Sequence, residues 1–128
     1  MTPIIVISDK FLDWKGTLSG YNIYGTFIFP FIVMRSKPES KKGIDRWNKT
    51  LNHESIHFNQ SIELLVVFYL LIYGCHYLIG RAKGMSHYDS YKNVVFEKES
   101  NTHEWEFDYL KNRPLFNWGR EKYPNKVE

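Results

Sequence analysis

Three residues in the segment HESIH have the types and the spacing of a zinc site, namely His53, Glu54 and His57. On a helix, residues four positions apart project from the same face, so both imidazoles can meet one ion at about 2.0–2.1 Å. Glu54 lies about 100° further round the helix, where its carboxylate can reach a metal-bound water without binding the metal. Zinc lowers the pKa of such a water, so Glu54 could accept its proton and later deliver it to a leaving amine. The segment therefore predicts one bound Zn²⁺ ion, with Glu54 as a general base.

The third protein ligand is predicted to come from an acidic stretch nearer the C-terminus. Helical spacing places Glu99 on the same face as Phe96 and Leu110, and a face with such residues should be the buried one. A buried carboxylate is costly unless it is paired or bound to metal, so Glu99 is the predicted ligand. Glu97 points nearly to the opposite side and is predicted to be solvated. This choice between Glu99 and Glu97 depends on a helix that is inferred from sequence alone.

Other side chains could assist these ligands. His103, one turn beyond Glu99, could be a ligand, a hydrogen-bond partner of a ligand or an oxyanion stabiliser, and a satisfied core histidine is an equal alternative. Tyr91 could polarise a substrate carbonyl, although aromatic packing is the commoner use of tyrosine. Gln60 and Glu63 follow the motif and could be hydrogen-bond partners of the ligands or only polar groups on the helix surface.

The elements that must position these residues indicate an α+β fold that is mainly α. Residues 3–8 and 21–34 are rich in β-branched and aromatic residues, which predicts a short β-hairpin or small sheet within residues 1–35. Glycines and a serine in 16–20 predict a turn between these strands. Pro30 predicts a break, a bulge or an edge position, because proline cannot donate to a sheet.

The rest of the chain is predicted to be helical. Residues 35–45 are expected to form a polar loop, after which a helix begins near Asn48 or Thr50. Residues 48–80 form the HExxH helix and an apolar helix, with the first continuing toward Gly74 or Gly80. Residues 88–112 form the final helix, which supplies the third ligand and ends before a proline. The expected whole is one zincin-like metal-binding domain over residues 1–128.

The pattern resembles a known class of protein. HESIH followed by an acidic residue on a later helix is similar to the gluzincin metallopeptidases. More closely, residues 48–114 resemble small bacterial proteins of Bacteroidetes type, which share an HExxH helix, an aromatic-rich apolar helix and a downstream FExEA-type motif. That motif matches Phe96–Glu99 here, with Ser100 where alanine is usual. In gluzincins the glutamate before that small residue is commonly the third ligand, so the resemblance also implies Glu99, and it implies zinc more firmly than proteolysis.

The composition limits which partners and which cellular compartment are expected for this protein. The 128 residues are 43% apolar and carry a formal charge of +3, which favours a globular fold and gives no sign of nucleic-acid binding. A single cysteine excludes an internal disulfide and favours a reducing compartment, so a cytoplasmic location or the cytoplasmic side of a membrane is expected. Residues 64–80 contain no charged side chain, and they could be a buried core helix or a surface for membrane or a partner protein.

Three functions are compatible with these features. The first is a zinc metallopeptidase, in which a zinc-bound water attacks a peptide carbonyl with Glu54 as base. The second is a non-catalytic, zinc-stabilised module for interaction or membrane association, in which the metal only joins two helices. The third is a helical protein without metal that binds membrane or a partner. A Glu54→Gln substitution would distinguish the first from the second, because only catalysis needs that carboxylate.

Overall fold

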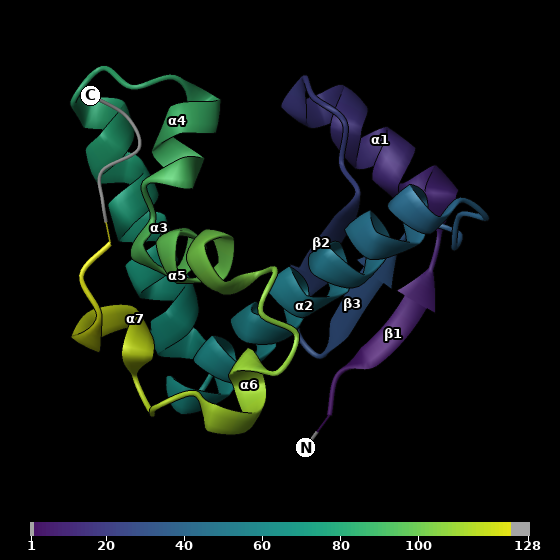
Figure 1. The fold of residues 1–128 in the computed structure, drawn as a ribbon. Coiled ribbons are helices and arrows are strands. Elements are labelled where there is room, and N and C mark those ends of the chain that lie inside the picture. The colour runs from purple at the N-terminus through teal and green to yellow at the C-terminus, as the bar shows by residue number, and fades with distance from the viewer. Residues whose placement is uncertain (1, 124–128) are drawn as a thin grey trace.

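The computed structural model describes residues 2–123, and it confirms an α+β fold that is mainly helical (Figure 1). A small sheet near the N-terminus is followed by helices that run to the end of the described chain. The elements are β1 (Ile4–Ile7), α1 (Asp9–Ser19), β2 (Gly25–Ile28), β3 (Phe31–Met34), α2 (Lys41–Glu63), α3 (Val67–Ala82), α4 (His87–Lys92), α5 (Val95–His103), α6 (Tyr109–Asn112) and α7 (Asn117–Arg120).

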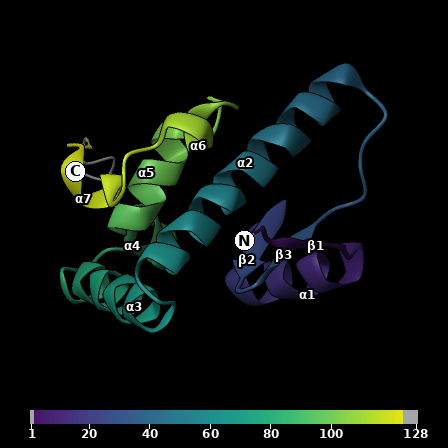
Figure 2. The ribbon, with the colours of Figure 1, turned by 90° about the horizontal axis from the view of Figure 1, so that it is seen from below.

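The long helix α2 lies in the middle of the molecule. Figure 2 shows the sheet and α1 on one side of α2, and the helices α3, α5 and α7 on the other. Each side has its own hydrophobic cluster: Leu12, Ile23 and Val33 lie between α1 and the sheet, whereas Tyr69, Val94 and Phe96 lie among the later helices. Between these clusters, the inner part of α2 buries mainly polar side chains, namely Asn52, His53, Glu54, His57, Gln60 and Ser61, together with Ile56 and Phe58.

The sheet has three strands in the order β1-β3-β2, so β2 is an edge strand. β2 and β3 form an antiparallel hairpin around Phe29 and Pro30, and β1 lies parallel to β3. The connection between β1 and β2 is not the simple turn predicted for 16–20, because it contains the helix α1. The Ser8 side chain accepts a hydrogen bond from the backbone of Phe11 at the start of α1, and Gly20 ends it with a φ of 82°.

Helix α2 begins earlier than the sequence predicts. It starts at Lys41 rather than near Asn48 or Thr50, so part of the expected polar loop is helical. Ser40 is the N-cap, and its hydroxyl accepts a hydrogen bond from the backbone N–H of Gly43 at 3.0 Å. The sequence favoured a later start because residues 35–45 are polar and because Asn48 or Thr50 could also cap a helix.

α2 does not continue toward Gly74 or Gly80, because the backbone breaks after Glu63. Leu65 and Val66 have φ angles of 55° and 61°, a left-handed conformation that is strained for a β-branched residue such as valine. The chain direction changes by 115° between α2 and α3. In the described residues no single helix is long and apolar enough to cross a membrane, and only the bent pair of α2 and α3 passes that test by length and composition.

The single helix predicted for residues 88–112 is divided into α4, α5 and α6. Ser86 caps α4, and Val94 is the extended residue that separates α4 from α5. Asn52 on α2 donates its amide to the carbonyls of His103, Glu104 and Glu106, at 3.3, 2.9 and 3.1 Å, which fixes the end of α5 against α2. α5 therefore has neighbours on several sides, with α2, α3, α4 and α7 all packed against it.

Candidate metal centre

The HESIH segment lies on α2 as predicted, with both histidines on one face. The rings of His53 and His57 lie 4.9 Å apart, centre to centre, and nearly perpendicular to each other. Both side chains are buried, as is Glu54 between them in sequence. Proteins seldom bury three such groups on consecutive turns without partners or a bound ion, so the residues that face them decide what the group can do.

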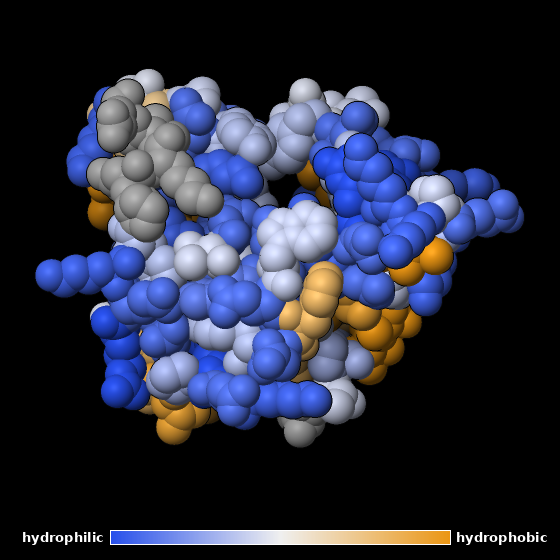
Figure 3. Space-filling model, viewed as in Figure 1, coloured by the Kyte–Doolittle hydropathy of each residue, from blue (hydrophilic) through white to orange (hydrophobic). Residues whose placement is uncertain are grey.

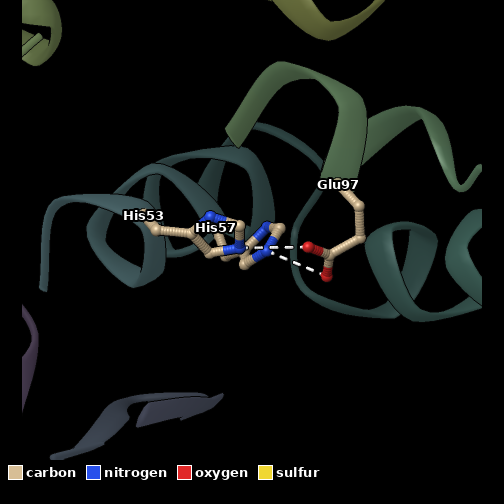
Figure 4. A group of neighbouring side chains, drawn as sticks. All are labelled: His53, His57 and Glu97. Carbon is tan, nitrogen blue, oxygen red and sulfur yellow. Dashed lines mark hydrogen bonds and ion pairs between the residues drawn. The ribbon is translucent and has the colours of Figure 1, made fainter. Parts of the chain in front are cut away.

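Glu97 on α5 faces both histidines (Figure 4). Its Oε1 lies 3.0 Å from Nε2 of His53, and its Oε2 lies 3.0 Å from Nε2 of His57. One ligand atom from each of these three buried residues lies within 4.8 Å of the others. Tetrahedral ligands at about 2.0–2.1 Å from zinc lie about 3.3 Å apart, which is close to the observed nitrogen–oxygen separations.

Each of these three side chains is held by a further residue on its outer side. Nδ1 of His53 donates to Oε2 of Glu104 at 2.7 Å, and Nδ1 of His57 donates to Oε1 of Gln60 at 2.8 Å. The hydroxyl of Tyr73 donates to Oε2 of Glu97 at 2.7 Å. Histidines that bind metals typically donate their other ring nitrogen in this way, which fixes the tautomer with Nε2 toward the ion. Gln60, left open by the sequence, thus contacts a candidate ligand.

One buried atom of the group lacks a hydrogen-bond partner. Nε2 of His57 is close to Glu97 but makes no hydrogen bond within the described residues. A buried polar atom without a partner costs about 1–3 kcal/mol, and a metal ion coordinated at that nitrogen would remove the cost. Two imidazole nitrogens and a carboxylate oxygen also form one of the common ligand sets of catalytic zinc. The residues therefore fit a zinc ion on both geometry and chemistry.

The electrostatics of the metal-free group are those of a tightly coupled cluster. Burial opposes the charged form of His53, but hydrogen bonds to Glu104 and Glu97 outweigh it and raise its pKa to about 10. Burial likewise opposes the charged form of His57, but the Glu97 carboxylate outweighs burial and raises the pKa of His57. Burial alone would raise the pKa of Glu97, yet the two histidines hold it well below its usual value. Positive charge is thus favoured beside Glu97, as a bound cation would require.

Glu99, the predicted third ligand, is buried but lies in a different cluster. Its carboxylate forms an ion pair with Arg113, at 3.0 Å from Nη2 to Oε1, and accepts hydrogen bonds from Gln60 and Tyr109. It is therefore not among the residues that the structure groups with His53 and His57. The inference that a buried carboxylate needs a partner was right, but the partner here is an arginine from beyond the helix rather than a metal.

Glu97 is the residue that sequence reasoning misplaced. It is 3% exposed, so the prediction that it is solvated is wrong. Glu97 and Glu99 are two residues apart, so they lie about 200° apart around the axis of α5. Because other helices pack on several sides of α5, both of these sides are buried. The prediction assumed that only one face of this helix is buried. Because α5 has two buried faces, burial of the Glu99 face did not identify Glu97.

The structure separates the two assisting residues named from the sequence. Tyr91 lines the same cavity as Glu54 and Glu97. Burial, and to a smaller extent the charge of Glu97, raises the pKa of Tyr91 well above its usual value. His103 lies apart from the histidine pair: its ring stacks on Tyr109 at 3.9 Å, and its two nitrogens contact Glu106 and Glu121. His103 thus belongs with the Glu99 cluster and is not brought to the candidate metal centre.

A cavity of about 480 Å³ opens beside the candidate metal centre. Glu54, His57 and Glu97 line it, together with residues of α1, the edge strand β2, α3 and α4. β2 approaches α2 so closely that a Cβ added at Gly25 would lie 2.7 Å from Thr50. A second hollow of about 240 Å³ shares Glu54 and Tyr91 and reaches His53. Figure 3 shows an opening between α1 and α4.

Glu54 differs from the other buried carboxylates of the centre. Among residues 2–123 no hydrogen bond or ion pair to its carboxylate is found, although it lines both hollows. Burial raises its pKa above the usual value for a glutamate, and the neighbouring histidines oppose this shift. Such a carboxylate is free to accept a proton from a water or a substrate in the cavity.

Comparison with known proteins gave no match. No family model matches the sequence, and neither the curated proteins nor the solved structures contain a significant match to this chain. The assignment of the centre therefore depends on its own geometry.

Tyr73 and Lys15, both of which line the cavity, were not identified from the sequence. Lys15 was missed because the helix that carries it was not predicted, and a turn was expected at residues 16–20.

Proposed function

We propose that this protein is a zinc-dependent peptidase of gluzincin type. His53, His57 and Glu97 hold one zinc ion, and Glu54 is the general base. The observation that carries the proposal is the position of Glu54, a buried carboxylate without a partner in the described chain, on the wall of a cavity beside a two-histidine, one-glutamate group. A purely structural zinc site would need no such carboxylate.

The chemistry follows from the positions of these groups. Bound zinc would lower the pKa of a water and polarise the peptide carbonyl. Glu54 takes one proton from the water as its oxygen forms a bond to the carbonyl carbon. Glu54 then gives that proton to the amide nitrogen as the carbon–nitrogen bond breaks, which releases a carboxylic acid and an amine, and the acid's proton can then pass to the amine. A raised pKa suits a group that must hold the proton between these two steps.

The cavity supports a peptide as the substrate class. β2 is an edge strand, and its four residues line the cavity beside the metal centre. An extended peptide can pair with an exposed strand edge through backbone hydrogen bonds. Apolar walls, formed largely by Phe27, Phe29, Tyr69 and Leu70, suit a large apolar side chain next to the bond that is cleaved.

The test begins with metal content and ends with hydrolysis. Elemental mass spectrometry of the purified protein should give about one zinc per chain, and the His53→Ala/His57→Ala variant should give none. The zinc-loaded protein should then cleave peptides from a mixed library, with cleavage followed by mass spectrometry. Glu54→Gln should retain zinc and lose at least a hundredfold in rate, since general base catalysis contributes about 10²–10⁴-fold.

Other outcomes would change the proposal in different ways. Zinc binding without cleavage of any peptide, in wild type as well as in Glu54→Gln, would replace the peptidase by a non-catalytic module in which zinc joins α2 to α5. Absence of zinc after reconstitution would contradict every metal-dependent function for this chain.

A second proposal concerns the outer face of α3, which we propose lies against an anionic membrane surface. Its large apolar side chains are exposed, and Arg81 and Lys83 follow them directly. An apolar face with a basic end is typical of helices that lie in the bilayer interface. The protein would then lie at the cytoplasmic side of a membrane, which agrees with the reducing compartment expected from its single cysteine. The exposed residues of this face are Val67, Phe68, Leu71, Leu78 and Ile79.

Vesicle sedimentation tests this second proposal independently of zinc. The protein should sediment with vesicles that contain phosphatidylglycerol, and a Leu71→Lys/Leu78→Lys variant should bind them at least tenfold more weakly. Equal binding of both proteins would contradict it.

A further inference from the structure

Lys15 is a cation on the wall of the cavity that also contains the candidate metal centre. It lies on α1, is partly buried, and donates a hydrogen bond from Nζ to the hydroxyl of Thr26 on β2. Glu54, His57 and Glu97 line the same cavity. We infer that Lys15 binds a carboxylate of the peptide substrate and so determines which peptides the site accepts, an inference that rests on the proposed peptidase function.

The first support is that Lys15 lacks an acidic partner in the part of the chain that the structure describes. Among residues 2–123 no carboxylate lies within 4.0 Å of its Nζ, and the hydroxyl of Thr26 takes one of its three N–H donors. Arg35 and Lys49, by contrast, are paired with Asp13 and Glu104. A partly buried ammonium with free donors is the arrangement expected for recognition of an anion that arrives with a ligand.

The second support is the charge balance of the cavity. Glu54 and Glu97 both act electrostatically on Lys15 and favour its charged form, although burial works in the other direction and lowers its pKa. A bound zinc ion would offset the charge of Glu97 and leave the cavity with more positive than negative charge. A substrate with one carboxylate would restore the balance, whereas a neutral peptide would leave Lys15 uncompensated.

The third support is the surroundings of Lys15, which define the rest of the ligand. Phe27, Phe29, Tyr69 and Leu70 supply an apolar wall to the same cavity. A volume of about 480 Å³ lies within the range of sites that bind small ligands or a few residues of a chain. The expected substrate therefore has a large apolar side chain and a carboxylate within one or two residues of the cleaved bond.

A peptide can supply that carboxylate from its C-terminus or from an acidic side chain, and the experiment separates the two. Binding is measured by calorimetry with zinc-loaded Glu54→Gln protein, which cannot consume the peptide. Four pentapeptides share a central phenylalanine and carry either a free or an amidated C-terminus, with either aspartate or asparagine beside the phenylalanine. The comparison is made with Lys15 intact, with Lys15→Met, and with Lys15→Arg.

We expect Lys15→Met to weaken binding of a carboxylate peptide at least tenfold while leaving the amidated asparagine peptide unchanged, and Lys15→Arg to restore most of the loss. The matched control is Lys10→Met, which removes an exposed lysine from the same helix and should change none of the four. If Lys15→Met does not fold, Thr26→Val replaces it, because loss of the hydroxyl frees Nζ from its position. That variant should also weaken carboxylate peptides selectively, by a smaller factor.

The inference is overturned if Lys15→Met affects all four peptides equally, if it affects none, or if no peptide binds. Its failure differs from that of the proposed function. Hydrolysis by wild type without discrimination by Lys15 would retain the peptidase and remove the role of Lys15. Selective binding of carboxylate peptides without hydrolysis would retain the role of Lys15 and remove the peptidase.

Discussion

Glu97 and Glu99 lie two residues apart on α5, and both are buried, yet they have opposite kinds of neighbours. Glu99 meets a permanent cation, Arg113, together with donors from Gln60 and Tyr109. Glu97 meets two histidines, whose charge depends on pH, and the hydroxyl of Tyr73. The carboxylate of Glu99 therefore has its counter-charge within the protein, whereas that of Glu97 acquires one only by protonation of the histidines or by binding a cation.

The difference shows how burial should be used to find a metal ligand. Burial of a carboxylate indicates only that something compensates it. What distinguishes Glu97 as the candidate ligand is incomplete compensation: near it, Nε2 of His57 lacks a hydrogen-bond partner in the described residues. The two clusters are joined by Gln60, which accepts from His57 and donates to Glu99.

The largest expected difference between the two glutamates is in zinc binding. Glu97→Gln should lower zinc affinity by about a thousandfold, because one ligand contributes about 4 kcal/mol of the roughly 10–16 kcal/mol of a structural zinc site. Glu99→Gln should lower it by less than tenfold. Competition with a chromophoric chelator at pH 7 measures both variants. Loss of zinc in Glu99→Gln with retention in Glu97→Gln would reverse the assignment and restore the prediction from sequence.

The second difference is in the stability of the metal-free protein. Glu99→Gln should lower the free energy of unfolding by about 3 kcal/mol, because a buried arginine loses one of its two carboxylate partners. The other partner, Glu63, remains 2.8 Å from Arg113 and limits the cost. Urea denaturation in the presence of a chelator measures this loss in the free energy of unfolding. In the double variant with Arg113→Met, the two losses should be less than additive, and full additivity would mean that the pair is not coupled.

The two halves of the candidate site, the HESIH segment on α2 and the acidic residues on α5, differ in how much the sequence could predict. HESIH is local, so its helix and the spacing of its two histidines follow from periodicity alone, and so does the proposal of Glu54 as a base. The candidate third ligand depends on how α5 is enclosed, which no local pattern reveals. The sequence did offer one signal, since Arg113 is a cation that follows the acidic stretch and could have been proposed as the partner of Glu99.

The fold shows the same division. The α+β class and the apolar helix could be predicted from composition and pattern. The helix α1 could not, because Gly16 and Gly20 favour a turn, and its buried Leu12 stabilises it only by packing on the sheet. The break at Leu65 and Val66 also has no local signal, because neither residue favours a left-handed backbone. Both features are imposed by tertiary packing.

Gln60, which joins the clusters, provides the third prediction. Gln60→Leu should lower zinc affinity by about 10–100-fold, because His57 loses the acceptor that fixes its tautomer. It should also destabilise the fold, since Glu99 loses a donor at 2.8 Å. Asn59→Leu is a control on the same turn, because its amide reaches only the backbone of Ser55. If the affinity of Gln60→Leu equals that of the control, then His57 is oriented by packing rather than by Gln60.

The smallest expected effect is the change that Glu104→Gln makes in the dependence of zinc affinity on pH. In the metal-free protein, hydrogen bonds to Glu104 and Glu97 overcome the cost of burial and raise the pKa of His53 to about 10. Below that pH His53 carries a proton that zinc must displace, so apparent affinity should rise with pH, by about tenfold per unit for each proton released. Glu104→Gln removes one of the hydrogen bonds that favour the protonated ring, so the rise between pH 7 and 9 should become shallower. Chelator competition at several pH values measures both slopes. A flat dependence in the wild type would mean that both histidines are already neutral, and that Glu97 holds its charge through Tyr73 alone.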